Sequence, residues 1–128
     1  METKKFEAAE KKRNGKFNCA QAITCTYCHK VGIDEQTALN LGNAFGTGMG
    51  CMEGTCGALV GAGIVLGLKN KDRIKSMKQM SQIMNKFQQR NGSTICKVLK
   101  GVETKHILRE CPDCVADAAE FLEECIAE

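Results

Sequence analysis

Apolar residues recur at helical spacing along most of the chain, and no stretch shows the strict alternation of a half-buried β-strand. Polar residues suited to capping precede these apolar stretches, and glycine follows several of them. We predict helices over residues 2–13, 19–30, 56–68, 72–89, 94–99 and 113–125, with a further short helix after Asp34. The sequence therefore predicts an all-α protein, a single-domain bundle of about five to seven helices over residues 1–128.

Segment 56–68 is the most apolar part of the chain and predicts the centre of the bundle. Its glycines, at 57 and 61 and at 63 and 67, fall in two four-residue spacings, which place small residues on two sides of a helix. We expect a central Gly-rich helix with close neighbours on both sides, which could serve a homodimer as well as a monomer. Helix 2–13 has little apolar content and is expected at the surface. In the other helices two apolar sets should face the core: Ala38, Leu41 and Phe45, and Ile74, Met77, Met80, Met84 and Phe87.

Composition and charge narrow the classes of function. The chain has 128 residues, of which 43% are hydrophobic, and this suits one domain. Its net charge of +3 is too small to indicate nucleic acid as a partner. The longest apolar run, residues 56–68, reaches only about 20 Å as a helix, against about 30 Å for a bilayer core. The N-terminus also lacks the apolar region of a secretory signal, so we expect a cytoplasmic protein without membrane insertion.

The nine cysteines are the main candidates for chemistry. In a reducing compartment, a large and odd set of cysteines indicates metal ligation or redox chemistry rather than structural disulfides. Four of them lie where a helix is predicted to start: Cys19 after Asn18, Cys56 after the cap Thr55, Cys96, and Cys111 as the N-cap before the sole proline. Helix N-termini stabilise thiolates. If these starts converge, the bundle holds a cluster of anionic sulfurs.

These cysteines also carry a family resemblance. The strings NCAQAI, CGALVGAGIVLGL, GSTIC and CPDCVADAAEFLEE resemble, in this order, the C_GCAxxG_C_C family of redox-active proteins. The segment 56–61 meets its CGAxxG signature, and the family's other three cysteines match Cys19, Cys96 and Cys111. The chain is also similar to part of the split-Soret cytochromes c, where related cysteines are thought to hold an iron–sulfur centre. The resemblance implies a small helical redox or metal-binding protein. Another pairing or an extra ligand stays open for the additional cysteines, Cys25, Cys28, Cys51, Cys114 and Cys125.

Several other motifs in the chain have simpler interpretations. CTYCH, residues 25–29, has the spacing of c-type haem attachment and should place Cys25, Cys28 and His29 on one helix side, but without a signal peptide we interpret it as an ordinary helix face. CPDC, residues 111–114, resembles a thioredoxin-type pair, although the thioredoxin fold needs a second proline.

The Gly-rich loop 45–57 is expected to fold around a site near Cys56. His106 is expected at the surface. The seven acids of residues 110–128 predict a solvated helix face or a docking face.

Three functional hypotheses follow. In the leading one, an iron–sulfur cluster serves electron transfer or redox sensing with a redox partner protein of unknown identity, and its ligands are Cys19, Cys56, Cys96 and Cys111. In the second, the protein is a dithiol–disulfide oxidoreductase in which Cys111 attacks and Cys114 or Cys56 resolves. In the third, zinc takes the place of the cluster in a structural module. The sequence leaves open whether the protein is an enzyme.

Overall fold

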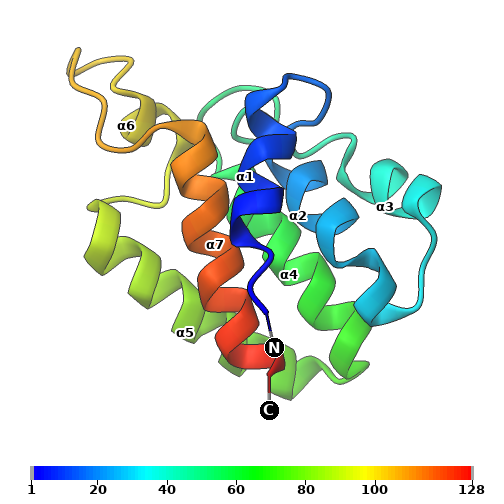
Figure 1. The fold of residues 1–128 in the computed structure, drawn as a ribbon. Helices are drawn as coiled ribbons and strands as arrows, with labels where there is room; N and C mark the ends of the chain where they lie inside the picture. The colour runs from blue at the N-terminus through cyan, green and yellow to red at the C-terminus, as the bar shows by residue number, and fades with distance from the viewer. Residues whose placement is uncertain (1, 128) are drawn as a thin grey trace.

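The computed structural model describes residues 2–127, and within them it contains helices and no β-strand, apart from one isolated bridge between Thr55 and Ile95. The helices are α1 (Lys5–Arg13), α2 (Cys19–Tyr27) with a following 3-10 turn η1 (Cys28–Val31), α3 (Glu35–Gly42), α4 (Gly57–Asn70), α5 (Arg73–Asn91), α6 (Cys96–Lys100) and α7 (Cys111–Ile126) (Figure 1). The predicted all-α bundle is confirmed. None of the helices described is long and apolar enough to cross a membrane.

Helix α4 lies at the centre of the bundle and contacts α2, α5 and α7 (Figure 1). A Cβ atom on Gly61 would lie 2.7 Å from the carbonyl oxygen of Ala20 and 2.9 Å from the Cβ of Ile23, so glycine permits the close approach of α2. On the other side, a Cβ on Gly63 would lie 3.3 Å from the sulfur of Met80 in α5. The predicted neighbours on two sides are confirmed for these glycines. Gly67 is the exception, because nothing lies within 4 Å of the position of its Cβ.

The local signals at the helix starts are only partly as predicted. Asn18 caps α2, and its side chain accepts from the backbone of Gln21 in a reciprocal capping box. In α4 the N-cap is Cys56 and not Thr55. In α7 the N-cap is Glu110, and Cys111 is the first helical residue, so the prediction that Cys111 is the N-cap is wrong by one position. Proline in the first turn is compatible with this shift, since its missing N–H would have no partner inside the helix.

Helix α5 contradicts part of its predicted core stripe. Ile83 and Phe87 are fully buried and Met80 and Met84 pack against the core, but Ile74 is 74% exposed and Met77 is 66% exposed. At about 100° per residue, Ile74 lies about 180° around the helix from Ile83, and Met77 about 120°. Ile74 and Met77 therefore point away from α4. Leu41 of α3 is likewise exposed, and only Ala38 of its predicted inner set is fully buried.

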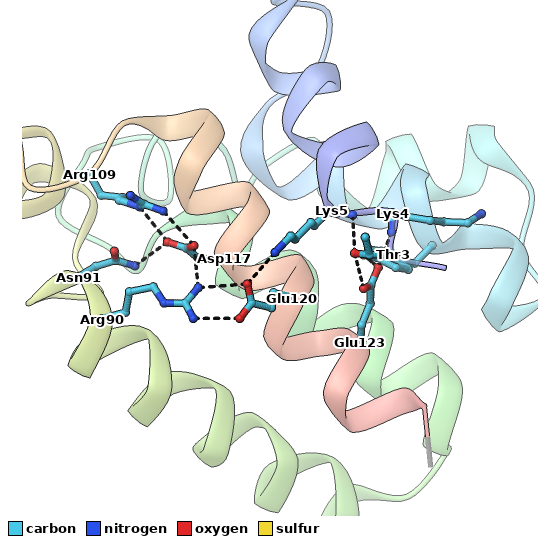
Figure 2. Close-up of polar contacts among 10 residues, drawn as sticks. Thr3, Lys4, Lys5, Arg90, Asn91, Arg109, Asp117, Glu120 and Glu123 are labelled. Atoms are coloured by element: carbon cyan, nitrogen blue, oxygen red, sulfur yellow. Dashed lines mark hydrogen bonds and ion pairs between the residues drawn. The ribbon is translucent and has the colours of Figure 1, made fainter. Parts of the chain in front are cut away.

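The acidic residues of helix α7 form ion pairs and hydrogen bonds with α1 and α5. Asp117, almost fully buried, accepts from Arg90 and Asn91 of α5 and from the Nε and Nη2 groups of Arg109. Glu120 pairs with Arg90 and with Lys5 of α1, and Glu123 accepts from the start of the chain (Figure 2). These three acidic residues of α7 therefore mainly hold the helix against its neighbours, and they do not form only a solvated face. Helix α1 is correspondingly less peripheral than predicted, because its Ala8 and Ala9 are buried in the bundle.

Candidate functional site

The starts of four helices supply sulfur atoms to one pocket. The side chains of Cys19 (α2), Cys56 (the cap of α4), Cys96 (α6) and Cys111 (α7) line it together, as the sequence hypothesis required. Cys114, one turn further along α7, is a fifth sulfur in the lining. Three cations also contribute to it: Lys12, Lys100 and Arg109. The roles assigned to these residues from the sequence stay predictions, while their convergence is a property of the fold.

The Gly-rich loop between α3 and α4 closes one wall of this pocket. A Cβ on Gly48 would lie 2.5 Å from the Cβ of Cys96, and one on Gly57 would lie 3.2 Å from the Cβ of Cys19. Gly48 also has a φ of +55°, which favours glycine. Neither position could therefore carry a side chain without moving a cysteine. This is the close approach that the glycines of the loop predicted.

Backbone hydrogen bonds fix Cys56 relative to Cys96. The amide of Cys56 donates to the carbonyl oxygen of Thr94 at 2.8 Å, and the amide of Cys96 donates to that of Gly54 at 3.0 Å. A third bond, from Lys97 to Met52 at 2.9 Å, continues the same short ladder. Two cysteines far apart in the sequence are thus held by main-chain contacts rather than by flexible side chains.

Four of the five sulfurs interact in two pairs. The largest influence on the pKa of Cys19 and of Cys111 is the other member of that pair, and the same holds for Cys56 and Cys114. We call Cys19 and Cys111 the outer pair, because Cys111 is partly exposed, and Cys56 and Cys114 the inner pair, because these two are only 5% and 2% exposed. The Cys114 thiol also lies 3.8 Å from the carbonyl oxygen of Arg109. Its single proton therefore has two acceptors, that oxygen and the Cys56 sulfur.

In each pair the pKa of one sulfur is lowered and the pKa of the other is raised. The hydrogen bond from Cys19 lowers the pKa of Cys111 to about 6, with help from the positive charges of Lys100 and Lys12 and against the effect of burial. The pKa of Cys19 rises, because its thiol donates that bond and because it is buried. Of the outer pair, Cys111 is therefore the sulfur that ionises more readily.

The inner pair repeats this arrangement. The hydrogen bond from Cys114, together with the amides of Ala58 and Leu59 at the start of α4, lowers the pKa of Cys56 despite burial. The pKa of Cys114 rises, because it donates to Cys56 and is buried. Burial also raises the pKa of Cys96, the pocket cysteine outside the two pairs, and this keeps the Cys96 sulfur protonated.

The three cations of the pocket differ in whether their charge can act on a cysteine. Arg109 binds both carboxylate oxygens of Asp117, at 2.9 and 3.1 Å, so its charge is largely compensated (Figure 2). Lys12 and Lys100, at the ends of α1 and α6, are the cations that act on Cys111. Sequence analysis missed both lysines. They carry no local signal that separates them from the other 16 basic residues, and only the fold places them beside a cysteine.

A metal centre fits this arrangement poorly. Among residues 2–127, no group of three or more His, Cys, Asp or Glu side chains is placed so that it could share one metal ion. The cavity between the sulfurs has a volume of about 20 Å³, close to the space of one water molecule. The donor chemistry suits iron or zinc, but the sulfurs would have to move apart to hold a cluster.

The cysteines outside the pocket have separate surroundings. Cys25 and Cys28 are buried in a second apolar cluster with Ala38, whereas His29 is exposed, so the expected common side of CTYCH is wrong. The reason is that α2 ends at Tyr27 and the chain continues in a 3-10 turn, which changes the direction of the following side chains. Cys51 is exposed on the Gly-rich loop. His106 is exposed, as expected.

Fold and site together define a small helical protein with a buried cluster of paired thiols. The family model described as "Putative redox-active protein (C_GCAxxG_C_C)" matches residues 17–125. The chain therefore belongs to the C_GCAxxG_C_C family of redox-active proteins, as its motifs indicated. No curated protein and no solved structure matches the chain.

Proposed function

We propose that this protein is a thiol–disulfide redox protein in which Cys111 and Cys19 interconvert between a dithiol and a disulfide. The observation that carries the proposal is the convergence of Cys111 and Cys19, from the starts of α7 and α2, on one pocket in which Cys111 is the cysteine that is partly exposed. Thiol–disulfide exchange needs one accessible thiolate and a second thiol within reach. The outer pair provides both, and the description of the family to which the chain belongs, "Putative redox-active protein", agrees with such a role.

The reaction is a transfer of two electrons to the disulfide of a partner. The Cys111 thiolate attacks one sulfur of that disulfide, which forms a mixed disulfide and releases one partner thiolate. Cys19 then attacks the Cys111 sulfur, and the second partner sulfur leaves with the proton that Cys19 gives up. The products are a Cys19–Cys111 disulfide and a partner dithiol, and the reverse sequence oxidises the partner. Lys100 and Lys12 stabilise the Cys111 thiolate before the attack.

The geometry favours Cys19 as the resolving residue over Cys114 or Cys56. Cys19 lines the same pocket as Cys111 and has the largest influence on its pKa, whereas the Cys114 thiol donates to the carbonyl oxygen of Arg109 at 3.8 Å. Sequence reasoning placed Cys19 only among the cluster ligands, since nothing in the sequence joins it to Cys111.

Mapping of the first disulfide tests this proposal. Reduced protein is treated anaerobically with one equivalent of glutathione disulfide, quenched with acid, digested and mapped by mass spectrometry. Cleavage before Asp113 separates Cys111 from Cys114, so their disulfides can be told apart. We expect Cys19–Cys111 to form first, and Cys111→Ala to abolish it, while Cys51→Ala leaves its rate unchanged. A first disulfide that lacks Cys111 contradicts the proposal.

The iron–sulfur cluster is a second candidate, favoured by the five thiols around one pocket. Its ligands would be Cys19, Cys56, Cys96 and Cys111, and it would supply electron transfer; zinc in the same place would give a structural module. Anaerobic purification separates the candidates through the visible spectrum and the contents of iron, zinc, labile sulfide and free thiols. Brown protein with labile sulfide favours the cluster, and colourless protein with zinc favours the module. Colourless, metal-free protein with a reversible thiol count favours the dithiol.

A further inference from the structure

The pocket contains twice as many paired thiols as one exchange reaction needs. The outer pair is sufficient for the proposed function, yet Cys56 and Cys114 line the same pocket as a second pair of buried cysteines. An external disulfide has no route to the inner pair, because Cys56 and Cys114 are buried and the cavity has space for about one water molecule. Whatever oxidises these two sulfurs must already lie inside the pocket.

We propose that the inner pair receives its disulfide from the outer pair, so that the pocket is a relay of two dithiols that stores four electrons. This inference rests on the proposed function, in which an external disulfide first oxidises Cys19 and Cys111. Each equivalent of external disulfide takes up two electrons and leaves as two thiols. The second equivalent reoxidises the outer pair after the first disulfide has moved inward.

The transfer takes two exchange steps and needs no further oxidant. The Cys56 sulfur attacks Cys111 of the Cys19–Cys111 disulfide, which forms Cys56–Cys111 and releases Cys19 as a thiolate. Cys114 then attacks Cys56, which forms Cys56–Cys114 and releases Cys111. The proton that Cys114 loses goes to the released Cys19 sulfur. One disulfide bond is broken and one is made, and the outer pair is again reduced.

The fold places the exchanging sulfurs next to one another. Cys111 and Cys114 are three residues apart in the first turn of α7, so their side chains lie on one side of that helix. Cys19 and Cys56 are opposite them, at the starts of α2 and α4, where Gly57 allows the two helices to approach. The ladder between residues 52–56 and 94–97 then holds Cys56 in place for its attack on Cys111.

A trapping variant tests the relay. Cys19→Ala combined with Cys114→Ala removes both thiols that would release the intermediate, so treatment with glutathione disulfide should end in a Cys56–Cys111 disulfide. If glutathione stays on Cys111 instead, the relay is overturned, while the proposed function is judged separately from Cys19–Cys111 in the wild type. The same pair of changes to serine provides a second variant if the alanine protein does not fold, as judged by its helical circular dichroism.

A time course on the wild-type chain gives an independent readout. With one equivalent of glutathione disulfide, Cys19–Cys111 should appear first and then decline as Cys56–Cys114 increases. Cys111→Ala should slow formation of the inner disulfide by about tenfold or more, because the only accessible attacking sulfur is lost. Cys51→Ala, which removes an exposed loop thiol, is the matched control and should change neither rate. An inner disulfide that forms equally fast without Cys111 rejects the relay.

Discussion

The sulfur of Cys111 is subject to influences from its own helix and from three others. The Cys19 thiol of α2 donates to it, Lys12 of α1 and Lys100 of α6 add positive charge, and its own position at the start of α7 adds the helix dipole. Burial opposes them by disfavouring the thiolate, but it does not prevail because the side chain is only partly buried. The nucleophile of the proposed reaction is therefore a product of tertiary structure and not of the CPDC motif alone.

Alkylation of Cys111 should follow its lowered pKa. In the reduced protein, we expect its rate of reaction with iodoacetamide to rise with pH to a half-maximum near pH 6, below the ordinary cysteine value of 9.0. Lys100→Gln removes a neighbouring charge and should move this midpoint upward by about 0.5 to 1 unit. Lys69→Gln, at an exposed position outside the pocket, should leave it unchanged. A wild-type midpoint near pH 9 contradicts this account of the site.

At this scale the sequence predicted positions better than interactions. Asn18 and Pro112 are local signals, so they located Cys19 and Cys111 close to the starts of helices. The interaction between these two cysteines in the pocket joins residues more than 90 positions apart, and no local pattern encodes it. The effect of Lys12 on Cys111 could not be predicted for the same reason, because only the packing of the bundle brings these two residues together.

Between elements, the approach of α2 to α4 depends on the absence of a side chain at Gly61. Gly61→Ala should destabilise the protein by about 1 to 3 kcal/mol, because the new methyl would meet the Ala20 carbonyl oxygen and the Ile23 side chain. Gly67→Ala is the matched control in the same helix. Nothing lies within 4 Å of that position, so the higher helix propensity of alanine should stabilise the protein by about 0.5 to 1 kcal/mol. Chemical unfolding measures both, and equal effects at the two positions disprove the packing argument.

The attachment of α7 to α1 and α5 should depend on pH through Glu120. Hydrogen bonds from Arg90 lower its pKa to about 2, with Lys5 adding to the effect, whereas the unfolded carboxyl titrates near 4.5. A lowered pKa in the folded state means that the ion pairs stabilise the fold above pH 4.5 and lose this effect as the pH falls from 4.5 to 2. Glu120→Gln should therefore reduce the drop in melting temperature across that range. If the melting temperatures of the variant and the wild type fall in parallel over this pH range, the ion pairs of Glu120 make no such contribution to stability.

Helix periodicity gave the elements correctly but not always their inner faces. In α5 two apolar lines were available, and the sequence did not show that the one through Ile83 and Phe87, rather than the one through Ile74, meets α4. In α7 the acidic residues suggested solvent, yet Asp117 is buried because Arg109 and Arg90 come from outside the helix to meet it. Such faces are decided by partners distant in sequence, and a single helix does not specify them.

At the scale of the whole molecule, the proposed chemistry couples redox state to stability. A disulfide between Cys19 and Cys111 joins the start of α2 to the start of α7 and closes a loop of roughly 90 residues. In the chain-entropy account, closing a loop of this length lowers the entropy of the unfolded chain by an amount worth about 4 to 5 kcal/mol. The native state already brings the two sulfurs to one pocket, so we expect the bond to need little rearrangement of the fold.

Oxidation should therefore raise the midpoint of guanidinium unfolding. The slope of the transition should also become shallower, because a cross-linked unfolded chain exposes less surface. Cys111→Ala, treated with the same oxidant, should show neither change, whereas Cys51→Ala should behave like the wild type because Cys51 takes no part in the outer pair. A lower midpoint for the oxidised wild type would mean that the disulfide pulls the starts of α2 and α7 out of their native positions. The two helix starts would then have to move with each turnover, and the outer pair could not serve as a preformed exchange site.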